Sequence, residues 1–207
     1  MPRLFLLSPA SCAGARARML LRDAADFELA RRIRSPAGAP IGDVFSFLSG
    51  LYFRGKLDYA RAFARTAPAL PGTLVITANA GVIAADTLIG IEGLRAAASV
   101  PIDLTEPRYR QPLEATVAEL ARQAPPDTQF VLLGSIATGK YIDVLHALLG
   151  DRLRFPAAFI GRGDMSRGGL LLRCVREGRE LDYIGVDGAV RRGRRPPRLE
   201  PLRRRPA

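Results

Sequence analysis

The sequence predicts an α/β fold: a three-layer domain with a central, mostly parallel sheet of about five strands. Short apolar runs without polar alternation are typical of strands buried on both faces. Helical patterns lie between these runs, and the composition, 48% hydrophobic and 25% charged, is that of an ordinary globular domain. The predicted strands are residues 4–7, 74–77, 130–133, 155–160 and 181–186.

Amphipathic patterns predict a helix in most of the intervals between strands. The predicted ranges are 13–22, 27–33, 51–65, 111–123, 141–149 and 165–176. Gly55 weakens the third range, Pro112 suits a first turn in the fourth, and Asp164 is expected to cap the last. Residues 35–50 and 78–110 show no such pattern, so we expect long irregular loops that are functional or lid-like.

The charge divides the chain into a single α/β domain, residues 1–190, and an Arg/Pro-rich tail, residues 191–207. The net charge is +11, and the tail alone holds eight Arg and one Glu. Because the tail has no apolar periodicity, we expect it to be disordered. It is interpreted either as a nucleic-acid-binding arm or as the solvated end of an Arg-biased chain, in which only Lys56 and Lys140 are lysines.

The start of the chain predicts a first strand and a cytoplasmic protein. The apolar run 4–7 is shorter than the 7 to 15 residues, roughly, of a signal peptide, and no run approaches the roughly 20 residues of a membrane span. Cys12 and Cys174 are therefore expected to be reduced thiols. Two cysteines and one histidine, His146, are too few for a zinc cage, so no metal and no cofactor are predicted.

Polar residues cluster after each of the first four predicted strands. In an open parallel sheet, ligands bind beyond the carboxyl ends of the strands, so these clusters are expected to meet at one edge. The alternative is that such loops are polar simply because they cap helices. The predicted ligand-binding residues are Ser8, Asn79, Gly134, Ser135, Thr138, Gly139, Lys140, Tyr141, Arg162, Asp164 and Ser166.

The segment VLLGSIATGKYIDVL, residues 131–145, fits the phosphate-loop pattern G-x-x-x-x-G-K through Gly134, Gly139 and Lys140. Tyr141 stands where that loop has the Ser or Thr that holds magnesium. A metal-free anion site is the better interpretation, with backbone amides at a helix N-terminus and the Lys140 ammonium as donors. The alternative is that Thr138 caps a helix and Lys140 lies on a solvated face.

Two other segments mix charged residues with glycine or aromatic residues. In FIGRGDMSRGGLLLR, Arg162 and Arg167 either clamp an anion or belong to an Arg162–Asp164 pair beside a capped helix. The segment 50–65 is either a core helix or a nucleic-acid surface on which bases stack. Its aromatic and basic residues are Tyr52, Phe53, Arg54, Lys56 and Tyr59.

Six segments carry a resemblance to known proteins: FLLSPAS, LYFRGKLDYARAFA, LVITANAGVIAADT, PRYRQPL, LLGSIATGKY and GRGDMSRGGLLL. In this order they resemble an uncharacterised bacterial family of single-domain α/β proteins over residues 3–186. More distantly the chain resembles the YaaA-type peroxide-stress proteins, which begin with a similar strand and SPA turn. This resemblance implies DNA binding in the oxidative stress response. The chain departs from that family at Ser11, where a Lys is expected.

The predicted function is a site for a phosphate-bearing ligand at the carboxyl edge of the sheet, which binds or acts on a nucleotide, nucleobase or nucleic acid. The alternative is a non-catalytic DNA-binding protein of stress protection. No nucleophile–base pair is recognisable in the sequence, so the sequence leaves open whether the protein is an enzyme.

The metal-free interpretation of residues 131–145 predicts that ligand binding is independent of magnesium. Tyr141→Ser restores the hydroxyl of a phosphate loop, yet it is expected to weaken binding because Tyr141 packs beside the ligand. Calorimetry of the wild type and this variant, with and without a chelator, measures both effects. Magnesium-dependent binding by the wild type would contradict the metal-free site.

Overall fold

The computed structural model describes residues 1–66, 69–187, 189, 193–194, 196–197 and 199, and it has the predicted α/β fold. Within these residues the main sheet has six strands in the order β4-β3-β1-β6-β7-β8. The strands are β1 (Arg3–Leu7), β3 (Thr73–Ile76), β4 (Val82–Ala84), β6 (Gln129–Leu133), β7 (Leu153–Pro156) and β8 (Tyr183–Gly185). The four central strands are parallel, and β4 and β8 are antiparallel at the two edges. Most of the predicted tail, residues 191–207, lies outside the described residues.

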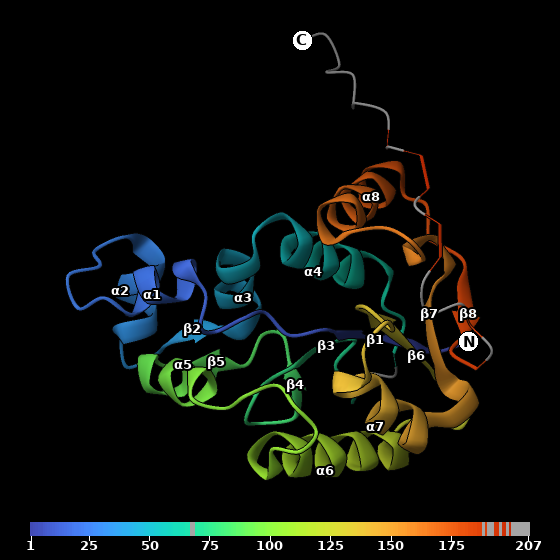
Figure 1. Ribbon diagram of the computed structural model, residues 1–207, viewed down its shortest axis with the longest axis horizontal. Helices are drawn as coiled ribbons and strands as arrows, with labels where there is room; N and C mark the ends of the chain where they lie inside the picture. Colours follow the sequence, from blue (N-terminus) through green and yellow to red (C-terminus); the bar gives the residue numbers. More distant parts are fainter. Residues whose placement is uncertain (67–68, 188, 190–192, 195, 198, 200–207) are drawn as a thin grey trace, which may run out of the picture.

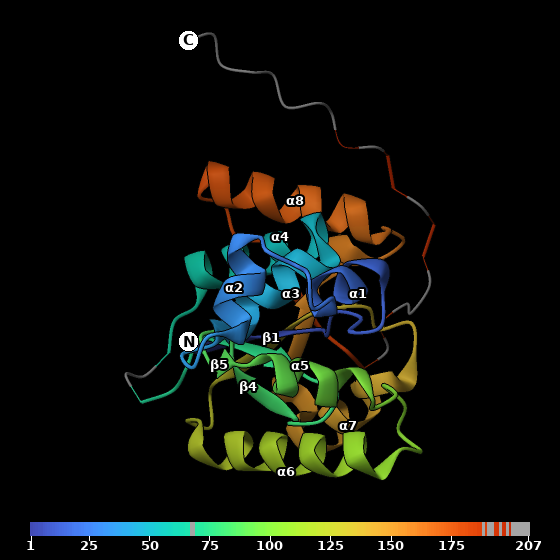
Figure 2. The same ribbon diagram turned by 90° about the vertical axis from the view of Figure 1, so that its left-hand side faces the viewer.

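Helices cover both faces of the sheet and make the three layers. Figures 1 and 2 show α4 (Leu51–Phe63) and α8 (Asp164–Glu177) over one face, and α6 (Pro107–Gln123) and α7 (Gly139–Leu149) over the other. The remaining helices gather beyond the carboxyl end of β1 (Figure 1). They are α1 (Ala15–Leu21), α2 (Glu28–Arg34), α3 (Ile41–Ser49) and α5 (Ile91–Ala98), beside the ribbon of β2 (Ala39–Pro40) and β5 (Leu88–Ile89). No helix of the described residues is long and apolar enough to cross a membrane.

The prediction of two long irregular loops is wrong. Residues 35–50 contain α3, and residues 78–110 contain β4, β5 and α5. Ile41, Val44 and Phe45 form the buried stripe of α3 at helical spacing. Gly and Ser residues interrupt this short stripe, so the hydrophobic periodicity of the segment is weak in the sequence.

Several predicted boundaries also shift, each for a local reason. The helix predicted from residue 111 begins at Pro107, where the Glu106 side chain accepts a hydrogen bond from the Arg108 amide, so Pro112 lies inside it. Asp164 is the first residue of α8 rather than its cap, which is Gly163. The strand predicted over 155–160 ends at Pro156 and continues as a short 3-10 turn.

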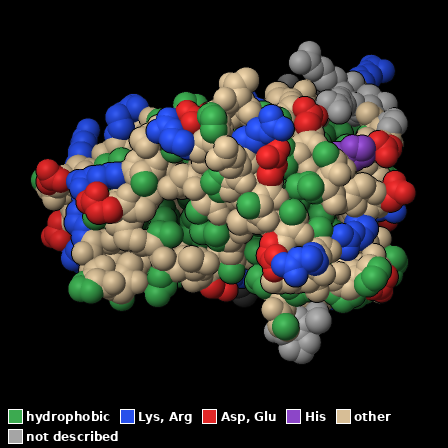
Figure 3. Space-filling view, turned by 90° about the horizontal axis from the view of Figure 1, so that it is seen from below, with side chains coloured by type: hydrophobic (Ala, Val, Ile, Leu, Met, Phe, Trp, Pro, Cys, Tyr) green, Lys and Arg blue, Asp and Glu red, His purple; other side chains and the backbone are tan. Residues whose placement is uncertain are grey.

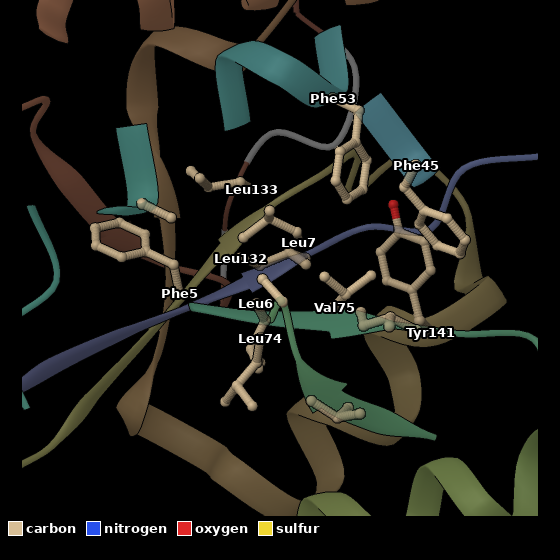
Figure 4. Packing of buried hydrophobic residues seen from close by; sticks show 14 of the residues in the cluster. Phe5, Leu6, Leu7, Phe45, Phe53, Leu74, Val75, Leu132, Leu133 and Tyr141 are labelled. Atoms are coloured by element: carbon tan, nitrogen blue, oxygen red, sulfur yellow. The ribbon is translucent and has the colours of Figure 1, made fainter. Parts of the chain in front are cut away.

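The core is built on β1, whose last four residues are fully buried. The Phe5 ring meets the Tyr59 ring of α4 edge-on, with 5.7 Å between their centroids. Figure 4 shows Phe53 above the ribbon of β1 and Leu74 below it, so both faces of the sheet are packed.

The four bulky residues Tyr52, Phe53, Lys56 and Tyr59 are buried while Arg54 is exposed, which confirms the core-helix interpretation of segment 50–65.

Helix α4 crosses α8 at two glycines. A methyl group at Gly55 would lie 2.7 Å from the Gly168 carbonyl oxygen, and one at Gly168 would lie 2.8 Å from Tyr52 Cα. The two backbones therefore approach more closely than any side chain permits. Gly55 weakens the helical pattern in the sequence, and in the structure it is the residue at which α4 packs against α8.

This crossing predicts opposite effects of alanine at two adjacent glycines of α8. Gly168→Ala forces the helices apart and is expected to lower the free energy of unfolding by about 1 to 3 kcal/mol. At Gly169 an added methyl meets only Leu199 Cδ1 at 3.6 Å, an ordinary contact. Gly169→Ala is therefore expected to be neutral or to stabilise by up to about 1 kcal/mol. Equal urea denaturation midpoints for the two variants would contradict the close crossing.

Candidate functional site

A cavity of about 680 Å³ opens at the carboxyl edge of the sheet. The chain passes from β1 to β3 on one side and later returns to β6 on the other, so the order of strands reverses at β1. Such a switch point leaves a crevice beyond the strand ends, where α/β proteins bind ligands. The cavity is lined by the segment after β1, by α4, by residues 97–102, by the β6–α7 loop and by the start of α8.

Six of the predicted ligand-binding residues line this cavity: Ser8, Ser135, Thr138, Lys140, Tyr141 and Asp164. Two predicted glycines, Gly134 and Gly139, lie next to these lining residues in the structure or in the sequence. A methyl group at Gly134 would lie 2.8 Å from Ser8 Cβ, and Gly139 is the first residue of α7. The carboxyl ends of β1 and β6 thus bring together residues that are more than 120 positions apart.

Asn79 lies one residue beyond the lining residue Ala78. The strand β3 continues into an antiparallel hairpin with β4 rather than into a helix. Thr77 closes that turn, because its hydroxyl donates to the Gly81 carbonyl and accepts from the Ala80 amide. Asn79 lies in this turn and is not among the residues that line the cavity.

Arg162 and Ser166 lie in a second, separate hollow. Arg162 donates to the Ala158 carbonyl and to the Ser166 hydroxyl. Arg167 donates to the Phe159 carbonyl and stacks over the Phe159 ring at 5.4 Å. Both guanidinium groups therefore hold the turn between β7 and α8, and neither lines the cavity.

Tyr141 shapes the β6–α7 loop from inside. Its hydroxyl accepts a hydrogen bond from the Ser135 amide at 3.0 Å and donates to the Ser135 carbonyl at 2.9 Å. One amide of the predicted anion loop is thereby occupied. The Asp143 carboxylate lies beside Gly139, where an added methyl would be 2.4 Å from Oδ2. Thr138, the N-cap of α7, makes no side-chain cap, and the Lys140 side chain is exposed.

Lys56 was predicted to lie in a core helix and was not among the predicted site residues, yet it lines the cavity. The side chain is 1% exposed, and its ammonium donates to the Ser8 carbonyl at 2.6 Å and to the Ser8 hydroxyl at 2.9 Å. The Tyr52 and Phe53 ring centroids each lie 4.6 Å from Nζ. The signal for Lys56 in the sequence is a lysine that stands within the apolar stripe of a predicted helix.

Burial sets the ionisation of the groups in this wall. Desolvation lowers the pKa of Lys56 to about 7; Asp164 acts in the opposite direction, and Arg167 adds to the lowering. Burial raises the pKa of the Cys12 thiol to about 11, so that thiol stays protonated. The Tyr52 hydroxyl is buried, its pKa is raised by desolvation, and it makes no hydrogen bond of normal geometry although Arg167 is near enough to interact.

Two carboxylates outside the cavity act locally. The Asp103 carboxylate accepts from the amide and hydroxyl of Thr105, which lowers its pKa, and Asp86 pairs with Arg61. Among the described residues, no three His, Cys, Asp or Glu side chains gather as a metal site. Both cysteines are free and buried.

Comparison with family models, curated proteins and solved structures finds no match to this chain. The resemblance to the YaaA-type proteins therefore stays a prediction.

The burial of Lys56 predicts a distinctive dependence of stability on pH. The folded chain releases this proton near pH 7, whereas the unfolded chain keeps it to about pH 10.4. Unfolding therefore takes up a proton between these values, and the free energy of unfolding rises with pH by up to about 1.4 kcal/mol per unit. Lys56→Met removes this rise.

Denaturant titrations from pH 6 to 10 measure the difference between wild type and variant. Lys140→Met serves as the control, because it removes the same charge from an exposed position. Parallel curves for wild type and Lys56→Met would contradict the buried, perturbed amine.

Proposed function

We propose that the protein binds a small phosphate-bearing molecule of nucleotide size in the cavity at the carboxyl edge of its sheet. The observation that carries the proposal is the lining itself: both lysines of the chain, Lys56 and Lys140, line one cavity with serine and threonine hydroxyls. The volume, about 680 Å³, is within the usual range for small-molecule sites.

The charge of the lining favours an anion. Asp164 is the one carboxylate among the described lining residues, and it lies 3.5 Å from the Arg167 guanidinium. The Lys140 side chain is exposed, and it lies near enough to the Asp103 carboxylate to contribute to the lowering of that group's pKa. It stands in the first turn of α7, where the helix dipole also favours negative charge.

A small molecule fits better than a nucleic acid surface. The aromatic residues of segment 50–65 that suggested base stacking are buried in the core. The face shown in Figure 3 carries Lys and Arg side chains scattered among Asp, Glu and uncharged residues rather than in a continuous stripe. A duplex is far too wide for the cavity, whereas a mononucleotide can place its phosphate at Lys140 and its base against residues 97–102.

The proposal predicts that a phosphate group on the ligand increases binding. Adenosine monophosphate at 100 times its dissociation constant should stabilise the protein by roughly 2.7 kcal/mol, a rise in melting temperature of about 5 to 10 °C. Adenosine should bind more weakly, and Lys140→Ala should abolish the difference at a cost of roughly 1.5 to 3 kcal/mol. Arg176→Ala, which removes an exposed charge outside the cavity, is the matched control.

Thermal shift and calorimetry measure these effects. Equal stabilisation by the nucleoside and the nucleotide would contradict a phosphate site. Binding of duplex DNA with a steep salt dependence, unchanged by Lys140→Ala, would favour the DNA-binding alternative instead.

A further inference from the structure

The chain uses lysine at two positions only, although it has 31 Lys and Arg residues, and both lysines line the same cavity. Everywhere else a positive charge is provided by arginine. An arginine can replace lysine as a charge, but its guanidinium stays protonated and is not a nucleophile. Because both lysines line one cavity, we expect that the reactivity of an amine, and not only its charge, is needed there.

The hydrogen bonds of Lys56 fit a neutral amine, whereas the Tyr52 and Phe53 rings 4.6 Å from Nζ favour the ammonium. A neutral amine has two N–H groups and one lone pair, and the Ser8 carbonyl and hydroxyl oxygens accept from two N–H groups. The lone pair is then left without a partner. No salt bridge of the described residues involves Lys56, so no carboxylate fixes it in the charged form.

The ionisable groups near Lys56 lie on two helices. Tyr52 lies on its own helix, and Asp164 and Arg167 lie on α8. The carboxylate and the guanidinium act in opposite directions, and desolvation dominates both. With a pKa of about 7, about half of the amine is neutral at pH 7, against about 1 in 2,500 for an ordinary lysine.

We propose that Lys56 is a catalytic residue that forms an imine with the aldehyde or ketone group of the cavity's substrate. The anionic character of that substrate rests on the proposed function; the reactivity of Lys56 does not. The neutral amine adds to the carbonyl carbon, and the carbinolamine that results loses its hydroxyl group as water. Nitrogen gives up both of its hydrogens, one to the carbonyl oxygen and one to the departing hydroxyl, so the products are an imine and one water molecule.

The other nucleophiles in the cavity are poorer candidates. Cys12 is held protonated by burial. The Ser8 hydroxyl accepts from Lys56, and no histidine lines the cavity to activate it. A buried lysine without an ion partner costs stability, and reactive lysines are activated by this same desolvation.

Reductive trapping tests the proposal. The protein is incubated at pH 7 with pyridoxal 5′-phosphate, pyridoxal or acetaldehyde, reduced with borohydride, digested and mapped by mass spectrometry. Because the only amines are Lys56, Lys140 and the chain's α-amino group, each adduct is assigned without ambiguity. We expect at least about tenfold more adduct at Lys56 than at Lys140, from the neutral fraction of a desolvated amine. In urea this preference should disappear.

Lys56→Arg keeps the charge but cannot form an imine, so its adduct at position 56 is lost while its melting curve shows that it folds. Absence of a Lys56 adduct with all three aldehydes would overturn the proposal, even if adenosine monophosphate still binds. Equal trapping at Lys56 by pyridoxal and its phosphate supports the reactive amine and contradicts the phosphate site. Preference for the phosphate that Lys140→Ala abolishes supports both.

Discussion

The close approach of α4 and α8 is the contact on which the site depends. Gly55 and Gly168 allow the two backbones to lie in contact. Helix α4 then lies over the carboxyl end of β1 (Figure 1). One residue after Gly55, Lys56 is thereby directed onto Ser8, and the start of α8 presents Asp164 to the same cavity. A backbone contact between two glycines thus decides where the polar side chains of the site lie.

The hydrogen bonds from Lys56 to Ser8 connect the buried core helix α4 to the cavity. Ser8 directly follows Leu7, the last residue of β1, and its carbonyl accepts a hydrogen bond from Lys56 of α4. Burial of an ammonium there disfavours the charged form, a desolvation cost that an apolar residue would avoid while leaving the Ser8 carbonyl without this hydrogen bond. The same desolvation that lowers stability at neutral pH makes the amine reactive, so stability and chemistry are opposed at one atom.

The sheet was predictable from the sequence because its central strands are unalternating apolar runs, and the rule of the carboxyl edge then located Ser8, Ser135 and Lys140. The missed elements are short: α3 and α5 have eight or nine residues, and small residues break their periodicity. Arg162 does not line the cavity, and a 3-10 turn stands between β7 and α8. Lys56 was not predictable by the rule, since it reaches the edge from a covering helix rather than from a strand end.

The division of labour between the two kinds of cation follows from their geometry. Guanidinium groups, with several N–H donors in a fixed fork, tie loops to helices by donating to backbone carbonyls. Arg34 donates to Ala30, Leu20 and Arg22, and Arg152 to Ala121 and Pro125. These contacts require a permanent charge. The Lys56 position requires the opposite, a cation that can give up its proton inside an apolar wall, and lysine alone among the two can do so.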